Sequence, residues 1–359
     1  MLDDFVTFGR SGLRVSRYAL GAFNFGGDQR WSLDVEAAQR LIARYRELGG
    51  NFLDAANSYG GGAAETILGD YLAASSGSRD RLVIASKFGS NTRPGDPNAG
   101  GGGRKAILQA CEDSLRRLRT DRIDLYWMHL WDPLTPMEET LRALDDLVRA
   151  GKILHIGFSN TPAWKISEAR WLAEFRNTAP VVGLQLQYSL LERSIEIEHV
   201  PMALAYGLGI AAWSPLKSGA LSGRYRRDDV ANHDTEGRAA FLARALDEKA
   251  EAVLAAVAGI ADRRGISFAQ VALAWIQAQP ALAVILIGAH DVMQLEENAA
   301  AANVVLSSED LAELDEISRP VIPYPGDFAR RAHGAVSGGT RINGIEPTPG
   351  GGSPSQAKA

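Results

Sequence analysis

The 359-residue sequence contains a single cysteine, Cys111, so no disulfide can form within the chain. Cys111 falls in a stretch with helical spacing, which predicts a small buried apolar side chain. The first residues, Met1–Phe5, do not show the basic segment and apolar run that mark a secretory signal peptide. No uncharged run reaches membrane-spanning length. These absences predict a cytoplasmic protein that has no contact with a membrane.

Basic residues are not in excess, since 38 Lys and Arg stand against 43 Asp and Glu, for a net charge of −5. A protein that binds nucleic acid would show a basic patch or stripe. The composition therefore argues against a nucleic-acid partner, although it leaves room for a local basic pocket that holds a phosphate group. Apolar residues make up 46% of the chain, enough to bury a large core and to exclude disorder of the whole chain.

Short apolar runs recur along the chain and alternate with segments of helical spacing. One such segment carries an apolar stripe at Ala38, Leu41, Ile42, Tyr45 and Leu48, and Gly49-Gly50 supplies its stop. The strand-like runs are 18–21, 51–54, 82–86, 123–128, 153–157, 183–187, 209–213 and 283–287. Eight strands with intervening helices predict an α/β fold, a single closed (β/α)8 barrel. The alternative is an open doubly wound sheet, which is weakened because no Gly-x-Gly-x-x-Gly turn follows the first strand.

Four further segments flank or interrupt the predicted barrel. Residues 5–9 and 13–16 surround Arg10-Ser11-Gly12 and predict a hairpin that plugs the N-terminal mouth. The long loops 89–103 and 214–234, the latter with Arg224, Arg226 and Arg227, are expected to cover a ligand at the catalytic rim. We expect the barrel domain to span residues 1–330, followed by a disordered tail over 331–359 that is rich in Gly, Pro and Ser towards its end.

Four polar residues stand where strand-like runs end, namely Asp54, Tyr59, Lys87 and His129. The C-terminal ends of barrel strands converge on one rim, which is where barrel enzymes place their chemistry. A tyrosine is a weak acid with a pKa near 10, and an adjacent ammonium lowers that value. Lys87 is expected to supply this charge, Asp54 to hold the ammonium, and His129 to orient a carbonyl or relay a proton. The alternative is a loop tyrosine beside a structural ion pair, but four convergent titratable groups favour function.

The surroundings of these residues resemble the aldo-keto reductase superfamily over about residues 5–330. The stretch Asn51–Gly60 is similar to the family signature around its Asp and Tyr, and 85–88 and 124–129 match the surroundings of its Lys and His. Further matches are Gly157-Phe158-Ser159-Asn160, Gln185-x-x-Tyr188, Trp213-Ser214-Pro215-Leu216, and Gly288-Ala289-His290 followed by 294–298. The resemblance implies an eight-stranded barrel and NAD(P)H-dependent interconversion of carbonyls and alcohols. It gives Asp54, Tyr59, Lys87 and His129 the roles described above.

A set of rim residues is expected to bind the cofactor, and the resemblance favours NADP(H), with NAD(H) as the alternative. Ser159 and Asn160 suit the carboxamide of a nicotinamide, and the resemblance selects Gln185 over Gln187 for the same group. Trp213 stands where the family stacks an aromatic ring on the nicotinamide, although an ordinary core aromatic is the alternative. The remaining predicted cofactor residues are Gly21, Ala22, Asp54, Ser214, Pro215, Leu216, Gly219, Leu221, Arg224, Gly288, His290, Gln294 and Asn298.

Two positions depart from the family pattern. Ala55 follows the Asp where Thr is frequent, and His290 stands where many relatives have an Arg that holds the 2′-phosphate of NADP. A guanidinium binds phosphate through two donors and stays charged, whereas a neutral imidazole offers one donor.

The remaining histidines, His155, His199, His233 and His333, show no metal-ligand spacing, so we propose no metal site.

Aromatic residues near the expected rim predict a pocket for a fairly large apolar or ring-bearing small-molecule substrate. The candidates are Phe23, Asn24, Trp31, Phe88, Trp131 and Phe328. Ordinary packing at the rim is the alternative for each of them. A second function from another class is a cofactor-binding regulatory subunit of the potassium-channel β-subunit type, with little turnover. The complete set of four polar residues favours the enzyme. A barrel hydrolase is a third possibility, but the sequence shows neither the paired carboxylates nor the cluster of metal ligands that such an enzyme would use.

Overall fold

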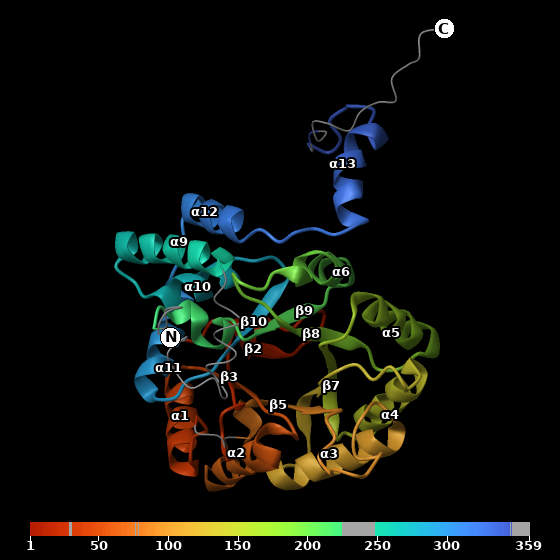
Figure 1. Ribbon diagram of the computed structural model, residues 1–359. Coiled ribbons are helices and arrows are strands. Elements are labelled where there is room, and N and C mark those ends of the chain that lie inside the picture. Colours follow the sequence, from red (N-terminus) through yellow and green to blue (C-terminus); the bar gives the residue numbers. More distant parts are fainter. Residues whose placement is uncertain (29–30, 76, 78, 225–247, 345, 347–359) are drawn as a thin grey trace. The chain divides into compact units, whose positions relative to one another are not determined.

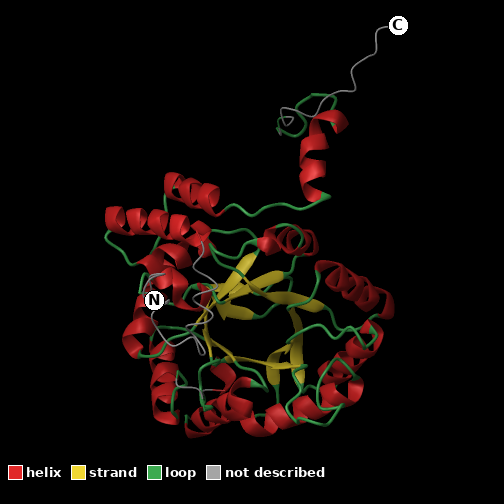
Figure 2. Ribbon diagram, viewed as in Figure 1, coloured by secondary structure: helices red, strands yellow, loops and turns green. Residues whose placement is uncertain are grey.

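The computed structural model describes residues 1–28, 31–75, 77, 79–224, 248–344 and 346. Two compact units divide the chain, Met1–Ser318 and Arg319–Ala359. Eight parallel strands of the first unit close into a barrel in the order β10-β3-β4-β5-β6-β7-β8-β9 (Figures 1 and 2). They are β3 (Tyr18–Gly21), β4 (Phe52–Asp54), β5 (Val83–Phe88), β6 (Ile123–Met128), β7 (Ile153–Ser159), β8 (Val181–Gln187), β9 (Gly209–Trp213) and β10 (Leu282–Ile287). The predicted barrel and all eight predicted strands are confirmed.

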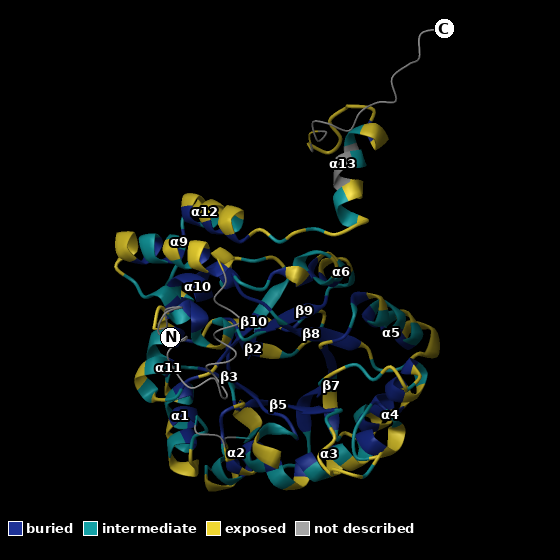
Figure 3. Cartoon of the chain, viewed as in Figure 1, coloured by how far each residue is buried: buried dark blue, intermediate teal, exposed yellow. Residues whose placement is uncertain are grey.

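Helices surround this ring of strands, and they carry buried residues beside exposed ones (Figure 3). The α-helices are α1 (Val35–Glu47), α2 (Ala63–Ala74), α3 (Arg104–Leu118), α4 (Met137–Arg149), α5 (Ala163–Arg176), α6 (His199–Tyr206), α9 (Glu248–Arg264), α10 (Phe268–Gln277), α11 (Val292–Ala300) and α12 (Ser308–Ser318). Short 3-10 helices are η1 (Tyr59–Gly62), η2 (Arg79–Arg81), η3 (Ser194–Glu196), η4 (Lys217–Ser222) and η5 (Ala301–Asn303). On α1 the predicted stripe residues from Ala38 to Tyr45 are buried, and Asp34 caps the first turn through the backbone N–H of Ala37.

Strand alternation divides the apolar core into two layers. One layer lies between the strands and the helices and includes Ile84, Phe88 and Tyr126. The other fills the barrel and consists of Phe8, Val15, Ala19, Phe52, Val83, Ala85, Leu125, Trp127, Val182, Ala211, Val284 and Leu286. Cys111 is buried on α3, as expected.

The N-terminal hairpin closes one end of the barrel. Its strands, β1 (Phe5–Thr7) and β2 (Arg14–Ser16), pair antiparallel, and Phe8 and Val15 join the inner layer. The backbone N–H of Arg10 donates to the carbonyl of Gly207, just before β9 begins, at 2.9 Å. Contact with the N-terminal end of a barrel strand leaves the opposite rim open, and this confirms the predicted plug.

The second unit contains α13 (Gly326–Val336). The compact barrel unit ends at Ser318 rather than at the expected residue 330, and α13 crosses that expected boundary. A helix can run through residue 330 because the sequence has no Gly or Pro between Gly326 and residue 334, and the run of Gly begins only at 338.

Candidate active site

Lys87 is the centre of the cluster that the sequence predicted. Its ammonium donates to Asp54 Oδ2 at 2.5 Å, to the carbonyl of Ala55 at 2.8 Å and to the phenol oxygen of Tyr59 at 3.0 Å. An ammonium has three N–H donors, so all three are used. Lys87 and Asp54 are fully buried, with side chains 0% and 1% exposed, so this ion pair lies in the protein interior rather than at its surface.

Strand register explains why these groups meet. Asp54 pairs with Ala85 across β4 and β5, and Lys87 lies two residues further along the same inward-facing row. Tyr59 lies in the loop after β4, beyond residues 55–58, and begins η1, in which Gly60 and Gly61 have φ of 55° and 64°. Glycine adopts this left-handed backbone without strain, so the chain can turn sharply after the phenol and enter α2.

The phenol of Tyr59 is held in its protonated form. Burial raises the pKa of Tyr59 above 10.0, the charge of Lys87 opposes this rise, and the charge of Asp54 adds to it. We expected Lys87 to make the phenol more acidic than a free tyrosine, but burial outweighs the charge of Lys87. Because the phenol oxygen accepts a hydrogen bond from Lys87, its own proton stays available for an acceptor on the rim.

Lys87 remains a cation in this environment. Burial lowers the pKa of Lys87, but the charge of Asp54 and the hydrogen bonds to Asp54 and Tyr59 outweigh burial, and the pKa lies above 10.5. The site therefore combines a charged ammonium with a neutral phenol at 3.0 Å. This is the arrangement that a proton donor needs when negative charge develops on a nearby oxygen.

His129 lies directly after β6 with its ring perpendicular to Tyr59, at a centroid separation of 5.8 Å. Burial, and then the charge of Lys87, lower the pKa of His129 from 6.5 to about 3. The imidazole is therefore neutral at neutral pH. Of the two expected roles, orienting a carbonyl by a hydrogen bond fits a neutral ring better than donating a proton does.

The lowered pKa of His129 predicts an acid-dependent stability difference. The unfolded chain takes up this proton near pH 6.5 and the folded chain only near pH 3, so acid favours unfolding. Relative to a His129→Gln variant, the parent should keep a constant stability above about pH 6.5 and lose up to about 1.4 kcal/mol per pH unit between there and pH 3. Urea unfolding of both proteins across this range measures the difference, and a difference independent of pH would contradict the neutral imidazole.

Two residues hold the second oxygen of Asp54, and sequence reasoning missed one of them. Trp127 Nε1 donates to Asp54 Oδ1 at 3.0 Å, and Gln185 Nε2 donates to the same atom at 2.9 Å. Gln185 was expected at the cofactor, but its amide nitrogen contacts Asp54 and its side chain is buried. Trp127 pairs with Lys87 in the register of β5 and β6, so its inward parity was the signal available in the sequence.

Three of the predicted cofactor residues form one hydrogen-bonded group on the rim. Ser159 Oγ donates to the carbonyl of Gln185 at 2.8 Å, and Asn160 Nδ2 donates to the carbonyl of His129 at 2.9 Å. Trp213 Nε1 donates to Asn160 Oδ1 at 3.2 Å, and its ring is half-buried. The indole of Trp213, the last residue of β9, is therefore fixed at the rim.

The loop after β9 has an unusual backbone. Ser214, Lys217 and Ser218 have φ of 51°, 46° and 56°, as does Asn160 after β7 at 48°. Non-glycine residues rarely adopt this region, and such residues cluster at ligand sites. The other expected residues here differ in exposure: Pro215 and Leu221 are buried, whereas Leu216 and Gly219 are partly exposed.

Arg224 ends this described segment and pairs with Glu297 on α11 at 3.3 Å. Arg226 and Arg227 lie outside the described residues.

The ends of β10 and β3 complete the rim. The backbone N–H of His290 donates to Gln294 Oε1 at 2.8 Å, and Asn298 Nδ2 donates to the carbonyl of Gly288 at 3.2 Å. Gly21 ends β3, and the N–H of Ala22 donates to the carbonyl of Asp54 at 2.8 Å. The predicted Gly288, His290, Gln294 and Asn298 are thus neighbours at the start of α11.

Aromatic rings surround the phenol, and two of the expected substrate residues are among them. Phe23 stacks on Trp31 at 5.2 Å and meets Tyr59 edge-on at 5.2 Å, while 61% of Phe23 stays exposed. Trp131 meets Trp164 edge-on at 5.8 Å. Phe23 therefore lies against the phenol with Trp31 stacked on it, where a substrate pocket was expected.

The prediction for Phe88 was wrong. Phe88 is fully buried in the outer layer against Tyr126, at a centroid separation of 5.0 Å. Since Lys87 points into the barrel, its neighbour Phe88 must point outward, away from the rim. Asn24 is also buried, and its Nδ2 donates to the carbonyl of Ala289 at 2.8 Å. Phe328 belongs to the second unit.

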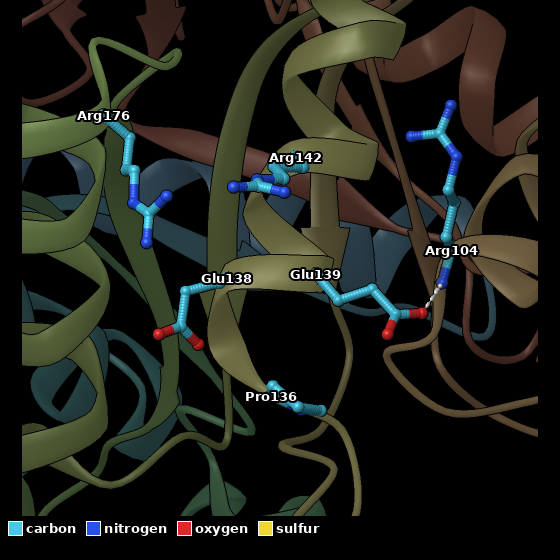
Figure 4. Close-up of a pocket in the computed structure, with 6 residues that line it drawn as sticks. All are labelled: Arg104, Pro136, Glu138, Glu139, Arg142 and Arg176. Carbon is cyan, nitrogen blue, oxygen red and sulfur yellow. Dashed lines mark hydrogen bonds between the residues drawn. The ribbon is translucent and has the colours of Figure 1, made fainter.

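A surface hollow of about 710 Å³ lies elsewhere, on α3, α4 and α5 (Figure 4). Its lining includes Arg104, Arg142 and Arg176 together with Glu138 and Glu139, and no residue of the Lys87 cluster. Among the described residues, no three His, Cys, Asp or Glu side chains come together as a metal site would require. No helix in the described part of the chain has the length and apolarity to cross a membrane.

Residues 17–319 match the model of the aldo/keto reductase family. The chain belongs to the aldo/keto reductase family. It is 36% identical to an uncharacterized oxidoreductase, YrpG, of Bacillus subtilis (strain 168), over 92% of this chain and 99% of that protein. It is 34% identical to norsolorinic acid reductase stcV of Emericella nidulans, over 89% of this chain and 81% of that protein. This chain is thus an oxidoreductase of the aldo/keto reductase family.

A third relative carries a different name. A probable voltage-gated potassium channel subunit beta of Oryza sativa subsp. japonica is 34% identical over 83% of this chain and 90% of that protein. This family generally uses NAD(P)H, and its members act on small molecules.

Proposed function

We propose that this protein interconverts aldehydes or ketones and alcohols with NAD(P)H, with Tyr59 as the general acid and base. One observation carries the proposal: the phenol oxygen of Tyr59 accepts a hydrogen bond from Lys87 at 3.0 Å, which leaves its proton directed elsewhere. In reduction, Tyr59 gives this proton to the carbonyl oxygen. Lys87 stabilises the phenolate that remains, and neutral His129 orients the carbonyl.

The rim residues suit a nicotinamide cofactor, which supplies or accepts the hydride when bound. Asn160 and Ser159 would hold its carboxamide, and the half-buried indole of Trp213 would cover one face of the ring. The unusual backbone at Ser214, Lys217 and Ser218 supports ligand binding by this loop. The backbone at the start of α11 would receive the adenosine end, because a helix N-terminus favours a phosphate. We expect NADP(H) to be preferred.

The aromatic rim favours a flat or ring-bearing carbonyl substrate. Phe23 meets the phenol ring edge-on and Trp31 stacks on Phe23. Phe23 is largely exposed, so a substrate ring can stack there without displacing a packed core residue. The aldo/keto reductase stcV of Emericella nidulans is named for a substrate of its own, norsolorinic acid. Its likeness supports the reductase direction for this chain.

The second candidate function is a regulatory subunit, as the name of the rice relative suggests. Such a protein needs the cofactor site but not a poised proton donor. In this chain the buried Lys87 joins Asp54 to the partly exposed phenol of Tyr59 through hydrogen bonds, which favours catalysis.

Two measurements together test the proposed function. Fluorescence titration with NADPH and NADH measures cofactor binding, and a steady-state screen of aryl aldehydes, ketones and alcohols measures turnover. Binding followed by turnover supports the enzyme. Binding without turnover of any carbonyl or alcohol would support the regulatory subunit instead.

His290 gives a prediction about cofactor preference. A His290→Arg variant should favour NADPH over NADH more strongly than the parent, because a guanidinium gains charge-assisted bonds to a 2′-phosphate that a 2′-hydroxyl cannot match. Such bonds contribute about 1.5–3 kcal/mol, roughly a ten- to hundredfold change in relative affinity. The measurement is the ratio of the two dissociation constants. His290→Gln, which adds no charge, is the control, and an unchanged ratio in His290→Arg would show that residue 290 does not face the 2′ position.

A further inference from the structure

Trp127 contacts the Lys87 cluster from inside the barrel. It is fully buried in the inner layer, and its indole N–H donates to Asp54 Oδ1 at 3.0 Å. Asp54 Oδ2 is bound by Lys87 at 2.5 Å. The two oxygens of one carboxylate thus have different partners, a cation on Oδ2 and neutral donors on Oδ1.

The barrel leaves a specific space for this indole. A Cβ built on Gly157 of β7 would lie 2.2 Å from two carbon atoms of the Trp127 ring, so only glycine fits beside it. Phe8 of the hairpin also meets the ring edge-on, at a centroid separation of 5.8 Å. These contacts fix the direction in which the N–H points.

We propose that Trp127 is a positioning residue for proton transfer, acting on Tyr59 through Asp54 and Lys87; this inference rests on the proposed function. A carboxylate can rotate about its bond to Cβ, and Lys87 alone would hold only one oxygen. The fixed indole N–H, together with Gln185 Nε2, holds the other oxygen, so Oδ2 stays in place for the ammonium. A hydrogen bond to Oδ1 also draws negative charge away from Oδ2. The ammonium is then shared more fully with the phenol oxygen.

The ionisable groups around this chain of contacts come from three strands. Asp54 ends β4, Lys87 belongs to β5, and His129 follows β6 and lies beside the phenol. Gln185 of β8, Gly157 of β7 and Phe8 of the hairpin are uncharged. Replacing the indole by a phenyl ring therefore removes one hydrogen bond without changing the charge of the cluster.

The test compares Trp127→Phe with Trp275→Phe. Trp275 is a matched control because it is also fully buried, and its Nε1 donates to a carboxylate, Asp315 Oδ1, at the same 3.0 Å. Both variants lose an indole and a hydrogen bond to an Asp, so both should unfold at a somewhat lower temperature. Only Trp127→Phe should lower kcat, by about tenfold, with little change in the KM of cofactor or substrate.

Trp127→Phe should also show a larger solvent deuterium isotope effect on kcat than the parent, since proton transfer becomes slower. A purely structural role would not change this quantity. If Trp127→Phe and Trp275→Phe share the same kcat and the same isotope effect, the inference is overturned.

A measurement without turnover separates failure of this inference from failure of the proposed function. In the ¹⁵N-labelled protein, the indole N–H resonance of Trp127 is the one that disappears in Trp127→Phe. If that variant does not fold, substitution of the other tryptophans leaves the Trp127 resonance identified by elimination. The Trp127 resonance should exchange slowly with water and should move on Asp54→Asn, whereas that of Trp275 should not move. A Trp127 resonance that exchanges fast would overturn the inference even in an active enzyme. Slow exchange in a protein that reduces no carbonyl would instead contradict the proposed function alone.

Discussion

Replacement of Tyr59 by phenylalanine should reduce kcat by about a hundred- to ten-thousandfold, the usual contribution of a positioned general acid. The variant removes the hydroxyl that accepts from Lys87 at 3.0 Å and leaves the ring against Phe23. Cofactor affinity should remain near that of the parent, because none of the rim residues around Trp213 hydrogen-bonds to this hydroxyl. The loss should fall on kcat, with binding intact.

A matched control is available in Tyr71→Phe. The hydroxyl of Tyr71 also accepts from a cationic side chain at 3.0 Å, Arg46 Nη1, but on α2 away from the rim. Steady-state kinetics and fluorescence titration of both variants measure the two effects. If Tyr59→Phe kept the kcat of Tyr71→Phe, Tyr59 would not be the proton donor.

The sequence predicted this cluster well because strand geometry is simple. Parallel strands end on one rim, and inward residues recur every second position, so Asp54 and Lys87 could be placed together from the strand pattern alone. The same rule, applied to Phe88, would have shown that it points outward. That prediction was wrong because Phe88 is the last residue of β5 and follows strand parity, whereas it was expected near the rim.

Other features depended on three-dimensional contacts that no local pattern contains. The hydrogen bond from Trp127 to Asp54 joins residues 73 positions apart and requires space at Gly157 on a third strand. The net pKa of Tyr59 depends on how completely the fold buries it, and burial outweighs the ammonium that the sequence made evident. The end of the barrel unit at Ser318 is set by packing of α12 on α9, which composition does not report.

Lys87→Met should both cripple catalysis and destabilise the protein, because it removes a buried cation while leaving its buried partner. Without the ammonium, the phenolate that forms on Tyr59 has no adjacent positive charge, so kcat should fall at least as far as in Tyr59→Phe. Asp54 would keep Trp127 and Gln185 as donors but lose its counter-ion. Removing one partner of a buried ion pair lowers the free energy of unfolding by about 3–5 kcal/mol, and urea unfolding measures that loss.

The double variant Lys87→Met/Asp54→Leu separates these two effects. It removes both charges, and replacing a buried ion pair by apolar side chains is often close to neutral for stability. It should therefore recover most of the stability lost in Lys87→Met and none of the kcat. Lys152→Met, which breaks a surface ion pair with Glu112, should change stability by about 1 kcal/mol or less and leave kcat unchanged. If the double variant regained turnover, the ammonium would not be what stabilises the phenolate, and the ion pair of Asp54 and Lys87 would be a structural element of the barrel rim.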